Sequence, residues 1–444
     1  PLRAGLFDSV IYDEASQMPV EYALPTLYRS KAMIVSGDEK QMPPTAFFSS
    51  RVENDEAEVF GGEDHDEDAS EEEREAVVET WNRREIKDCP DLLQLAKSVL
   101  PNTTLQIHYR SVYRELIQFS NSAFYLNSLS VPARHPEDEI RRVRPIELIR
   151  ADGVYHNQTN RTEAERVVEL LDELWAKPRQ DRPTIGVVTF NRKQADLIEE
   201  VLERRAERDP QFREALGEER DRYEAGEDMS FFVKNVENVQ GDERDVIVFS
   251  STFGRNVQGA FRRAFGVLGQ KGGERRLNVA VTRARRKVYL VTSMPIGLIS
   301  DLLTTRRAAS SPRDHLQAYF EYARAVSDGE LDVAQGLLGR VASERRPEHC
   351  RQTENQHDGF QASVAAFIRE QGWEPVETSD IGAFGLDFAV VDPRTGLFGI
   401  GIECDAPQHG LLTHARAREM WRPSVLRRSI PTVHRVSSQA WHHE

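Results

Sequence analysis

Short continuous apolar runs alternate along this chain with segments in which apolar residues recur every three or four positions. The continuous runs predict buried strands at residues 6–12, 32–38, 184–190, 246–250 and 287–292. The periodic segments predict helices at residues 90–100, 115–124, 161–175 and 194–208. The Pro- and Arg-rich stretch 131–145 predicts a loop. Because strands that alternate with helices form parallel sheets covered by helices, the pattern predicts an α/β fold.

Two adjacent carboxylates, Asp13 and Glu14, directly follow the first apolar run. A buried parallel strand delivers the residues at its end to the edge of the sheet. In a nucleoside triphosphatase, the first acid at such an edge holds Mg²⁺, directly or through water, and the second polarises the attacking water. An ordinary strand end with two solvated acids is the alternative.

The second run ends in Gly37 and Asp38, and Gln41 follows three residues later. A glutamine just beyond a strand of the same sheet can reach a γ-phosphate or its attacking water. A loop ended by proline is the alternative. The two strand ends together predict a nucleotide site more strongly than either does alone.

Composition and charge limit the class of protein. With 444 residues, 39% of them hydrophobic, the chain predicts two to four domains, and no apolar run approaches the length of a membrane span. The net charge is −15, but residues 53–79 hold fourteen acids and one base and so contribute −13, leaving −2 elsewhere. The remaining surface can therefore carry basic tracks for nucleic acid. Three widely spaced cysteines form no disulfide or zinc pattern, which predicts a cytoplasmic protein.

Five blocks resemble, in order, the motifs of superfamily-one helicases, in the branch that contains the RNA-surveillance and replication helicases. The blocks are Tyr-Asp-Glu-Ala-Ser at 12–16, Gly-Asp-Glu-Lys-Gln at 37–41, His-Tyr-Arg-Ser at 108–111, Glu-Asn-Val-Gln-Gly-Asp-Glu at 237–243 and Val-Thr-Arg-Ala at 281–284. The resemblance covers residues 1 to about 295. It implies two RecA-like lobes that clamp ATP, with single-stranded nucleic acid running across both.

The resemblance also implies roles for individual residues. Asp13 would serve Mg²⁺, Glu14 the hydrolytic water, and Gln41 the γ-phosphate. From the second lobe, Arg110 and Arg283 would reach the phosphates. Three further residues would contact the nucleotide or couple it to the nucleic-acid strand: Gln240, Gly241 and Glu243.

The sequence departs from this family at one place, because it contains no Gly-x-x-x-x-Gly-Lys-Ser/Thr phosphate loop. In the family that loop precedes the Asp-Glu strand, and this chain begins at Pro1 without an initiator methionine or a signal peptide. The sequence therefore predicts the C-terminal part of a longer helicase, with an incomplete first lobe. We expect the isolated chain not to turn over ATP.

A smaller α/β unit is predicted after residue 345. A strand at 385–391, a Pro-Arg-Thr-Gly hairpin and a strand at 398–405 bring Asp387 and Glu403 to one edge, where two carboxylates can hold Mg²⁺ for phosphodiester cleavage. The unit resembles restriction-endonuclease-like domains of the PD-(D/E)XK type, similar to very-short-patch-repair endonucleases. The resemblance implies that Asp387 and Glu403 are metal ligands, with Asp405 and His409 as polar partners. Asp405 stands where the family has lysine, so a nuclease-like fold with a dead site, kept for DNA binding or docking, is the alternative.

The sequence as a whole predicts four segments: an incomplete first RecA-like lobe at 1–104 with an acidic insertion at 51–80, a second lobe at 105–295, a helical connector at 296–345 and a restriction-endonuclease-like domain at 346–444. The predicted function is an ATP- and Mg²⁺-dependent helicase with an endonuclease-like appendage. It would act on single-stranded or duplex DNA in repair, recombination or defence, without a membrane. An RNA helicase, or a nucleic-acid-binding clamp with silent sites, is the alternative.

Overall fold

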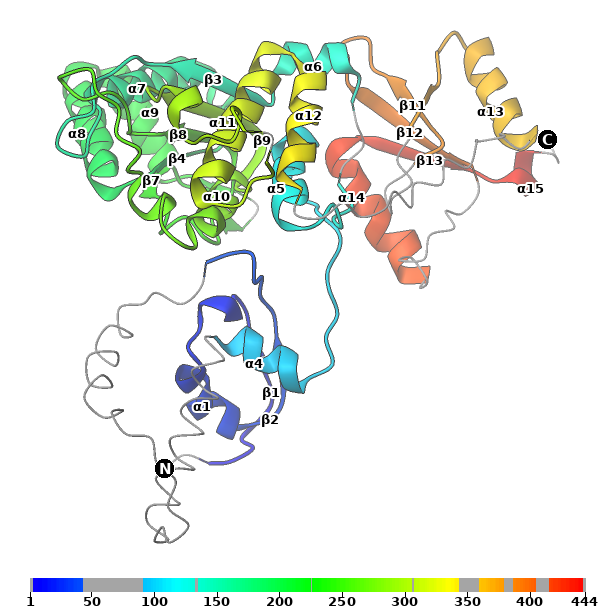
Figure 1. The fold of residues 1–444 in the computed structure, drawn as a ribbon. Coiled ribbons are helices and arrows are strands. Elements are labelled where there is room, and N and C mark those ends of the chain that lie inside the picture. The colour runs from blue at the N-terminus through cyan, green and yellow to red at the C-terminus, as the bar shows by residue number, and fades with distance from the viewer. Residues whose placement is uncertain are drawn as a thin grey trace, which may run out of the picture. The chain divides into compact units, whose positions relative to one another are not determined.

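The structure, a computed structural model, describes residues 3–42, 91–131, 135–224, 226–305, 307–342, 359–378, 386–404 and 415–441. They belong to two compact units, Pro1–Leu105 and Gln106–Glu444 (Figure 1). The predicted acidic insertion, Asp405 and His409 lie outside the described residues. Within the described parts of the chain, no helix has the length and apolarity needed to cross a membrane.

The first unit is built on two parallel strands. β1 (Phe7–Tyr12) pairs with β2 (Ser30–Val35), and α1 (Val20–Tyr28) connects them. The short helix η1 (Ala15–Gln17) and α4 (Leu92–Val99) complete the unit. The buried side chains that form its core are Tyr12, Ala15, Ala23, Leu92 and Leu93.

The opposite face of these two strands is open. Ile11 and Ile34 are direct partners in the sheet, yet their side chains are 69% and 58% exposed. Phe7 is also exposed on β1. Because parallel sheets bury both faces, this unit lacks a covering layer among the described residues.

The second unit contains a parallel five-stranded sheet, which confirms the predicted α/β fold. All four neighbouring strand pairs run parallel. The strands in spatial order are β3 (Ile146–Arg150), β9 (Ala284–Thr292), β8 (Arg244–Ser250), β4 (Ile185–Thr189) and β7 (Phe232–Asn235).

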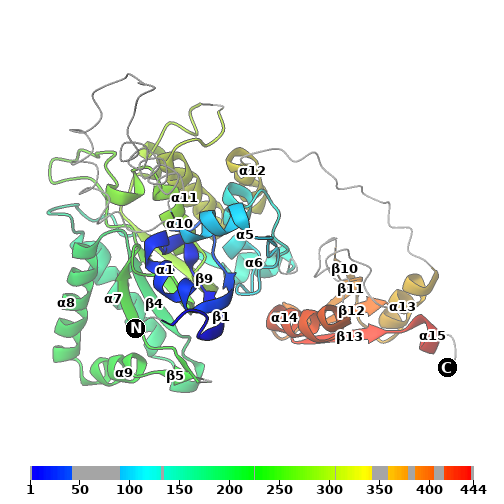
Figure 2. The ribbon, with the colours of Figure 1, turned by 90° about the horizontal axis from the view of Figure 1, so that it is seen from below.

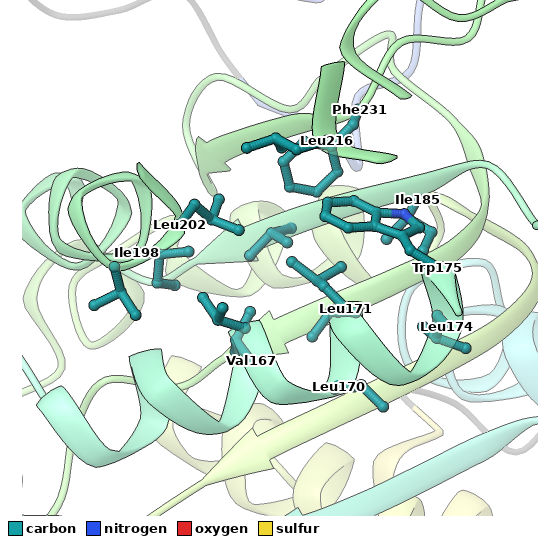
Figure 3. Packing of buried hydrophobic residues seen from close by; sticks show 14 of the residues in the cluster. Val167, Leu170, Leu171, Leu174, Trp175, Ile185, Ile198, Leu202, Leu216 and Phe231 are labelled. Atoms are coloured by element: carbon teal, nitrogen blue, oxygen red, sulfur yellow. The ribbon is translucent and has the colours of Figure 1, made fainter. Parts of the chain in front are cut away.

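One face of this sheet is covered by α7 (Arg161–Trp175) and α8 (Arg192–Arg208), which lie side by side (Figure 1 and Figure 2). Figure 3 shows their apolar side chains gathered on the strand that carries Ile185. Trp175 closes the end of this core, where its ring contacts Phe212 of α9 (Pro210–Arg220) and Phe231. The apolar stripes that predicted these helices therefore form the core of the lobe.

The other face is covered by α5 (Glu115–Phe124), α10 (Gly273–Val281) and α11 (Pro312–Asp328). Phe320 of α11 contacts Phe190, and Tyr322 donates a hydrogen bond of 2.9 Å to the backbone oxygen of Glu115. The segment expected as a connector at 296–345 thus supplies a helix packed onto the sheet. The predicted loop at 131–145 was wrong in part, since α6 (Glu137–Val143) forms there with acids in its first turn and arginines in its last.

The C-terminal domain has one four-stranded sheet between two helices (Figure 1 and Figure 2). Its strands in spatial order are β10 (Val376–Glu377), β11 (Phe388–Val391), β12 (Phe398–Cys404) and β13 (Thr432–Val436). The first three are antiparallel, and β12 and β13 are parallel. Apolar residues of α13 (Gly359–Glu370) pack on one face, and those of α14 (Arg422–Ser429) pack on the other.

The remaining short elements connect these layers. They are η2 (Arg179–Asp181), β5 (Tyr223–Glu224), β6 (Glu227–Asp228), η3 (Gly266–Leu268), η4 (Ile296–Leu298), α12 (Leu331–Val341), the π-helical η5 (Ala417–Trp421) and α15 (Ser438–Trp441).

Candidate functional site

Asp13 and Glu14 lie in the turn that leaves β1. Glu14 has a left-handed backbone, with φ of 52°, and its N–H donates to Oδ1 of Asp13 at 3.0 Å. The Asp13 side chain is exposed. A left-handed conformation is costly for a residue other than glycine, and such residues cluster at functional sites. The turn therefore presents the Asp13 carboxylate at the carboxyl end of the strand.

The loop after β2 lies beside this turn. The N–H of Ala15 donates to the backbone oxygen of Ser36 at 2.9 Å. A Cβ on Gly37 would lie 3.1 Å from the backbone nitrogens of Ala15 and Ser16, so glycine permits the close approach of the two segments. The ends of the two strands, and the motifs that follow them, are thus at one edge of the sheet.

Gln41 lies in this second loop, and only the nitrogen of its side-chain amide is hydrogen-bonded to a described residue. Its Nε2 donates to Oδ2 of Asp38 at 3.0 Å. Its Oε1 is buried and accepts no hydrogen bond from the described residues. A buried amide oxygen without a donor is unfavourable, so this atom is available to a water or another donor.

In the second unit, Glu243 holds two arginines. Arg110 donates from Nε to Oε2 of Glu243, and Arg285 donates from Nε to Oε1 at 3.0 Å. Arg110 also donates to the backbone oxygen of Thr282 at 3.1 Å. Burial raises the pKa of Glu243, but the hydrogen bonds and charges of Arg110 and Arg285 outweigh it and lower the pKa from 4.5 to about 2. The Glu243 carboxylate is therefore ionised and forms an ion pair with each arginine. Arg285 is a partner that the sequence motifs did not predict.

Arg283 is placed differently from Arg110. It is 2% exposed. Its Nε donates to the backbone oxygen of Val279 at 2.7 Å, and its NH2 donates to the hydroxyl of Thr282 at 3.0 Å. In this conformation the guanidinium is bonded to the end of its own helix. Its predicted contact with phosphate would require it to change partners.

The loop that contains Gln240 is held by a turn and an ion pair. The N–H of Asp242 donates to the backbone oxygen of Val239 at 3.2 Å, and Lys234 contacts the Asp242 carboxylate at 2.7 Å. Gly241 has a φ of +88°, a left-handed value that favours glycine. The motif thus depends on glycine for its backbone, which fixes the position of Glu243 two residues later.

His108, in the same block as Arg110, is a neutral imidazole. Its Nε2 accepts a hydrogen bond from the N–H of Ser111 at 3.1 Å, so that nitrogen carries no proton. Burial, followed by the positive charges of Arg110 and Arg283, lowers the pKa of His108 from 6.5 to about 3. Protonation would remove an acceptor and add a charge beside two arginines.

The His108→Asn variant is expected to lose less stability on acidification than the wild type. Because the pKa of His108 is lower in the folded state, its contribution to the free energy of unfolding is fully present above pH 6.5. That contribution is lost as the pH falls from 6.5 toward 3, by up to about 1.4 kcal/mol per pH unit. Urea unfolding at pH 7 and pH 5 measures this loss. Equal losses in the two proteins would contradict the account.

Asp387 and Glu403 face each other across two strands of the C-terminal sheet. Phe388 and Ile402 are direct partners in β11 and β12, and the two acids are the next pair beyond them. Asp387 accepts hydrogen bonds of 2.7 Å from Nε2 of Gln361 and from the N–H of Cys404. Asp387 thus lies directly before β11 and is bonded to the neighbour of Glu403 on β12.

Glu403 has two cationic partners that the sequence reading did not assign to it. Arg435 is its direct partner on β13 and donates to Oε2 from Nε and NH2 at 3.3 and 3.2 Å. Arg422, at the start of α14, forms an ion pair with Oε1. Burial, followed by the charge of Arg435, lowers the pKa of Arg422 to about 10, and Asp387 raises it. Arg422 is therefore charged at neutral pH.

The described residues contain no group of three or more His, Cys, Asp or Glu side chains that could hold a metal ion. Any metal site in these residues would need ligands from the nucleotide, from water or from outside the described parts of the chain.

The parallel five-stranded sheet with helices on both faces is the architecture of a RecA-like lobe. Residues 90–295 match the family model of an AAA domain, AAA_12, and residues 360–444 match the family model REase_MTES_1575. The chain therefore carries a superfamily-one helicase-like domain followed by a restriction-endonuclease-like domain, which confirms both resemblances.

Its relatives are named as ATP-dependent helicases. The "Uncharacterized ATP-dependent helicase MG140 homolog" of Mycoplasma pneumoniae is 38% identical over 291 residues, 65% of this chain and 23% of that protein. The "DNA replication ATP-dependent helicase/nuclease DNA2" of Saccharomyces cerevisiae is 25% identical over 314 residues, 67% of this chain and 18% of that protein. The chain thus spans about a quarter or less of the length of these relatives.

One solved structure also matches part of this chain. The C-terminal domain of a possible DNA helicase from Lactobacillus is 13% identical, and the match covers 42% of this chain and 90% of that chain. The TM-score is 0.25, so this likeness supports no argument about the fold.

Proposed function

We propose that this chain is the C-terminal part of an ATP-dependent DNA helicase whose phosphate-binding loop lies on an upstream part of the same polypeptide. One observation carries the proposal. Asp13, Glu14 and Gln41 follow two neighbouring parallel strands, yet the sequence contains no phosphate loop to serve them. The open strand face at Ile11 and Ile34 supports the proposal, since further elements of the lobe would cover it.

Asp13 fits the requirements of a Mg²⁺ ligand in such a site. Its carboxylate is exposed, and Mg²⁺ in nucleotide sites is held by one or two carboxylates together with phosphate and water oxygens. Bound there with ATP, Mg²⁺ would offset the negative charge of the phosphates. Glu14 would orient and polarise the attacking water, and the buried Oε1 of Gln41 would accept a hydrogen bond from that water.

Arg110 would stabilise the charge that develops on the phosphates. In the structure it is bonded to Glu243, and a polyphosphate offers the same kind of charged oxygen acceptor. Arg285 keeps Glu243 paired when Arg110 changes partners. Arg283, Gln240 and Gly241 complete the proposed nucleotide-coupled set.

DNA is the proposed substrate, in repair, recombination or defence, and the cytoplasm is the proposed location. Support comes from the restriction-endonuclease-like domain and from the relatives named as DNA replication helicases. An RNA helicase is the alternative, because the motor motifs do not distinguish the sugar. A clamp with silent sites is the second alternative.

The test is nucleic-acid-stimulated ATP hydrolysis by the longer polypeptide that joins this chain to its upstream part. We expect single-stranded DNA to stimulate the rate at concentrations where RNA of the same sequence does not. Stimulation by RNA alone would replace the proposal with an RNA helicase. A lack of hydrolysis with either polymer would favour the clamp.

A Mg²⁺-dependent endonuclease is a second candidate for the C-terminal domain, because Asp387 and Glu403 face each other. Asp405 and His409 belong to the same hypothesis. The contacts of Glu403 do not fit a Mg²⁺ ligand, however, since each of its carboxylate oxygens already contacts a guanidinium group. We therefore derive no cleavage step and propose a nuclease-like fold that serves DNA binding or docking.

A further inference from the structure

Two acids and an arginine lie near one another on neighbouring strands of the C-terminal sheet. Asp387, directly before β11, accepts a hydrogen bond from the N–H of Cys404, the neighbour of Glu403 on β12, and Glu403 is the direct partner of Arg435 on β13. The Arg422 side chain approaches Glu403 from α14 and is 0% exposed, and the Glu403 residue is 3% exposed. A carboxylate so deeply buried needs a partner of opposite charge, and here it has two.

The bonds of Arg435 extend this network toward the surface. Its NH1 donates to Glu419 at 2.7 Å, and its side chain is 29% exposed. Arg435 therefore links the buried Glu403 to an exposed acid, whereas Arg422 is enclosed entirely. Among the described residues, Glu403 thus contacts a guanidinium group with each carboxylate oxygen.

A dication at Glu403 would have to replace these partners. Two guanidinium groups already contact its oxygens, so a metal ion bound there would meet two positive charges at short range. Displacing Arg422 would leave a buried guanidinium without its partner, which is strongly unfavourable. Asp387 alone among the described acids would remain as a ligand, and both of its oxygens accept hydrogen bonds.

We infer that Glu403 is the internal counter-ion of Arg422 and Arg435 and is not a metal ligand. The two facing carboxylates of this domain therefore do not form a Mg²⁺ centre. This inference does not depend on the proposed helicase activity.

The two roles of Glu403 predict opposite changes in the stability of the metal-free protein. If Glu403 were a ligand, neutralising it would relieve repulsion with Asp387 and stabilise the domain. As a counter-ion, its neutralisation leaves Arg422 and Arg435 unbalanced and destabilises the domain. The sign of the effect separates the roles without an activity assay.

The experiment uses the 444-residue chain in EDTA, with thermal unfolding and hydrogen exchange of peptides from β12 and β13 as readouts. We expect Glu403→Gln to lower the melting temperature of the domain by at least about 10 °C and to speed exchange in both strands. The double variant Arg422→Met/Glu403→Met removes the buried pair together and is expected to recover most of the loss. Asp387→Asn is the matched control on the facing strand and is expected to have a smaller effect.

Binding of Mn²⁺, followed by electron paramagnetic resonance, provides the second readout. We expect the double variant to bind Mn²⁺ at least as tightly as the wild type does. If the wild type does not bind Mn²⁺, we expect the double variant not to bind it either, and the result agrees with the inference. A higher melting temperature for Glu403→Gln would overturn the inference. So would loss of Mn²⁺ binding in a folded double variant when the wild type binds the ion.

Discussion

In the longer polypeptide, Glu14→Gln is expected to lower the kcat for ATP hydrolysis by about 100- to 10,000-fold, the contribution of a positioned general base. Glutamine keeps the size of the side chain but cannot accept a proton from the attacking water. Because Asp13 and the proposed phosphate loop are unchanged, the KM for ATP should change little. Steady-state hydrolysis in the presence of single-stranded DNA measures both constants.

Glu21→Gln is the matched control for this change. Glu21 is an exposed acid in the first turn of α1, in the same unit, and it belongs to none of the motifs. We expect the kcat of the Glu21→Gln variant to equal that of the wild type. If the two variants lose activity equally, or neither does, Glu14 is not the general base.

Arg110→Ala is expected to lower kcat in the longer polypeptide by at least about 1,000-fold, as removal of an arginine finger does. The guanidinium would stabilise charge that spreads over the transferring phosphoryl group, and alanine cannot replace it. Single-turnover hydrolysis, measured with the enzyme in saturating excess over ATP, isolates this effect from nucleotide binding.

Arg285→Ala provides an internal comparison. Arg110 and Arg285 both bond to Glu243, so either change leaves the carboxylate with one arginine. The structural disturbance is therefore similar, while only Arg110 is expected to reach the phosphates. Equal losses of kcat would show that Arg110 acts through Glu243 and not on the nucleotide.

Much of the fold could be predicted because local signals and tertiary packing agree. The apolar spacing at 115–124 and 161–175 matches α5 and α7 at both ends. Asn160 accepts a hydrogen bond from the N–H of Glu163 and so begins α7 at the predicted residue. The short α6 was missed because its seven residues lack an apolar period and follow a proline, Pro136.

The site was predictable only as far as sequence motifs extend. Motif order placed Glu14 and Gln41 at strand ends, but their neighbours depend on the approach that Gly37 permits. The partners of Glu403 could not be predicted, since Arg435 reaches it through the parallel register of β12 and β13. Such pairs depend on strand pairing and helix packing, which residue spacing does not encode.

The most direct test of the account compares ATP hydrolysis by this chain alone and by the longer polypeptide. The chain holds Asp13, Glu14 and Gln41 but no phosphate loop. We predict that single-stranded DNA stimulates hydrolysis by the longer polypeptide and that the isolated chain shows no hydrolysis above the Glu14→Gln background. Hydrolysis by the isolated chain at a rate typical of helicases, abolished by Glu14→Gln, would contradict the claim that its nucleotide site is incomplete.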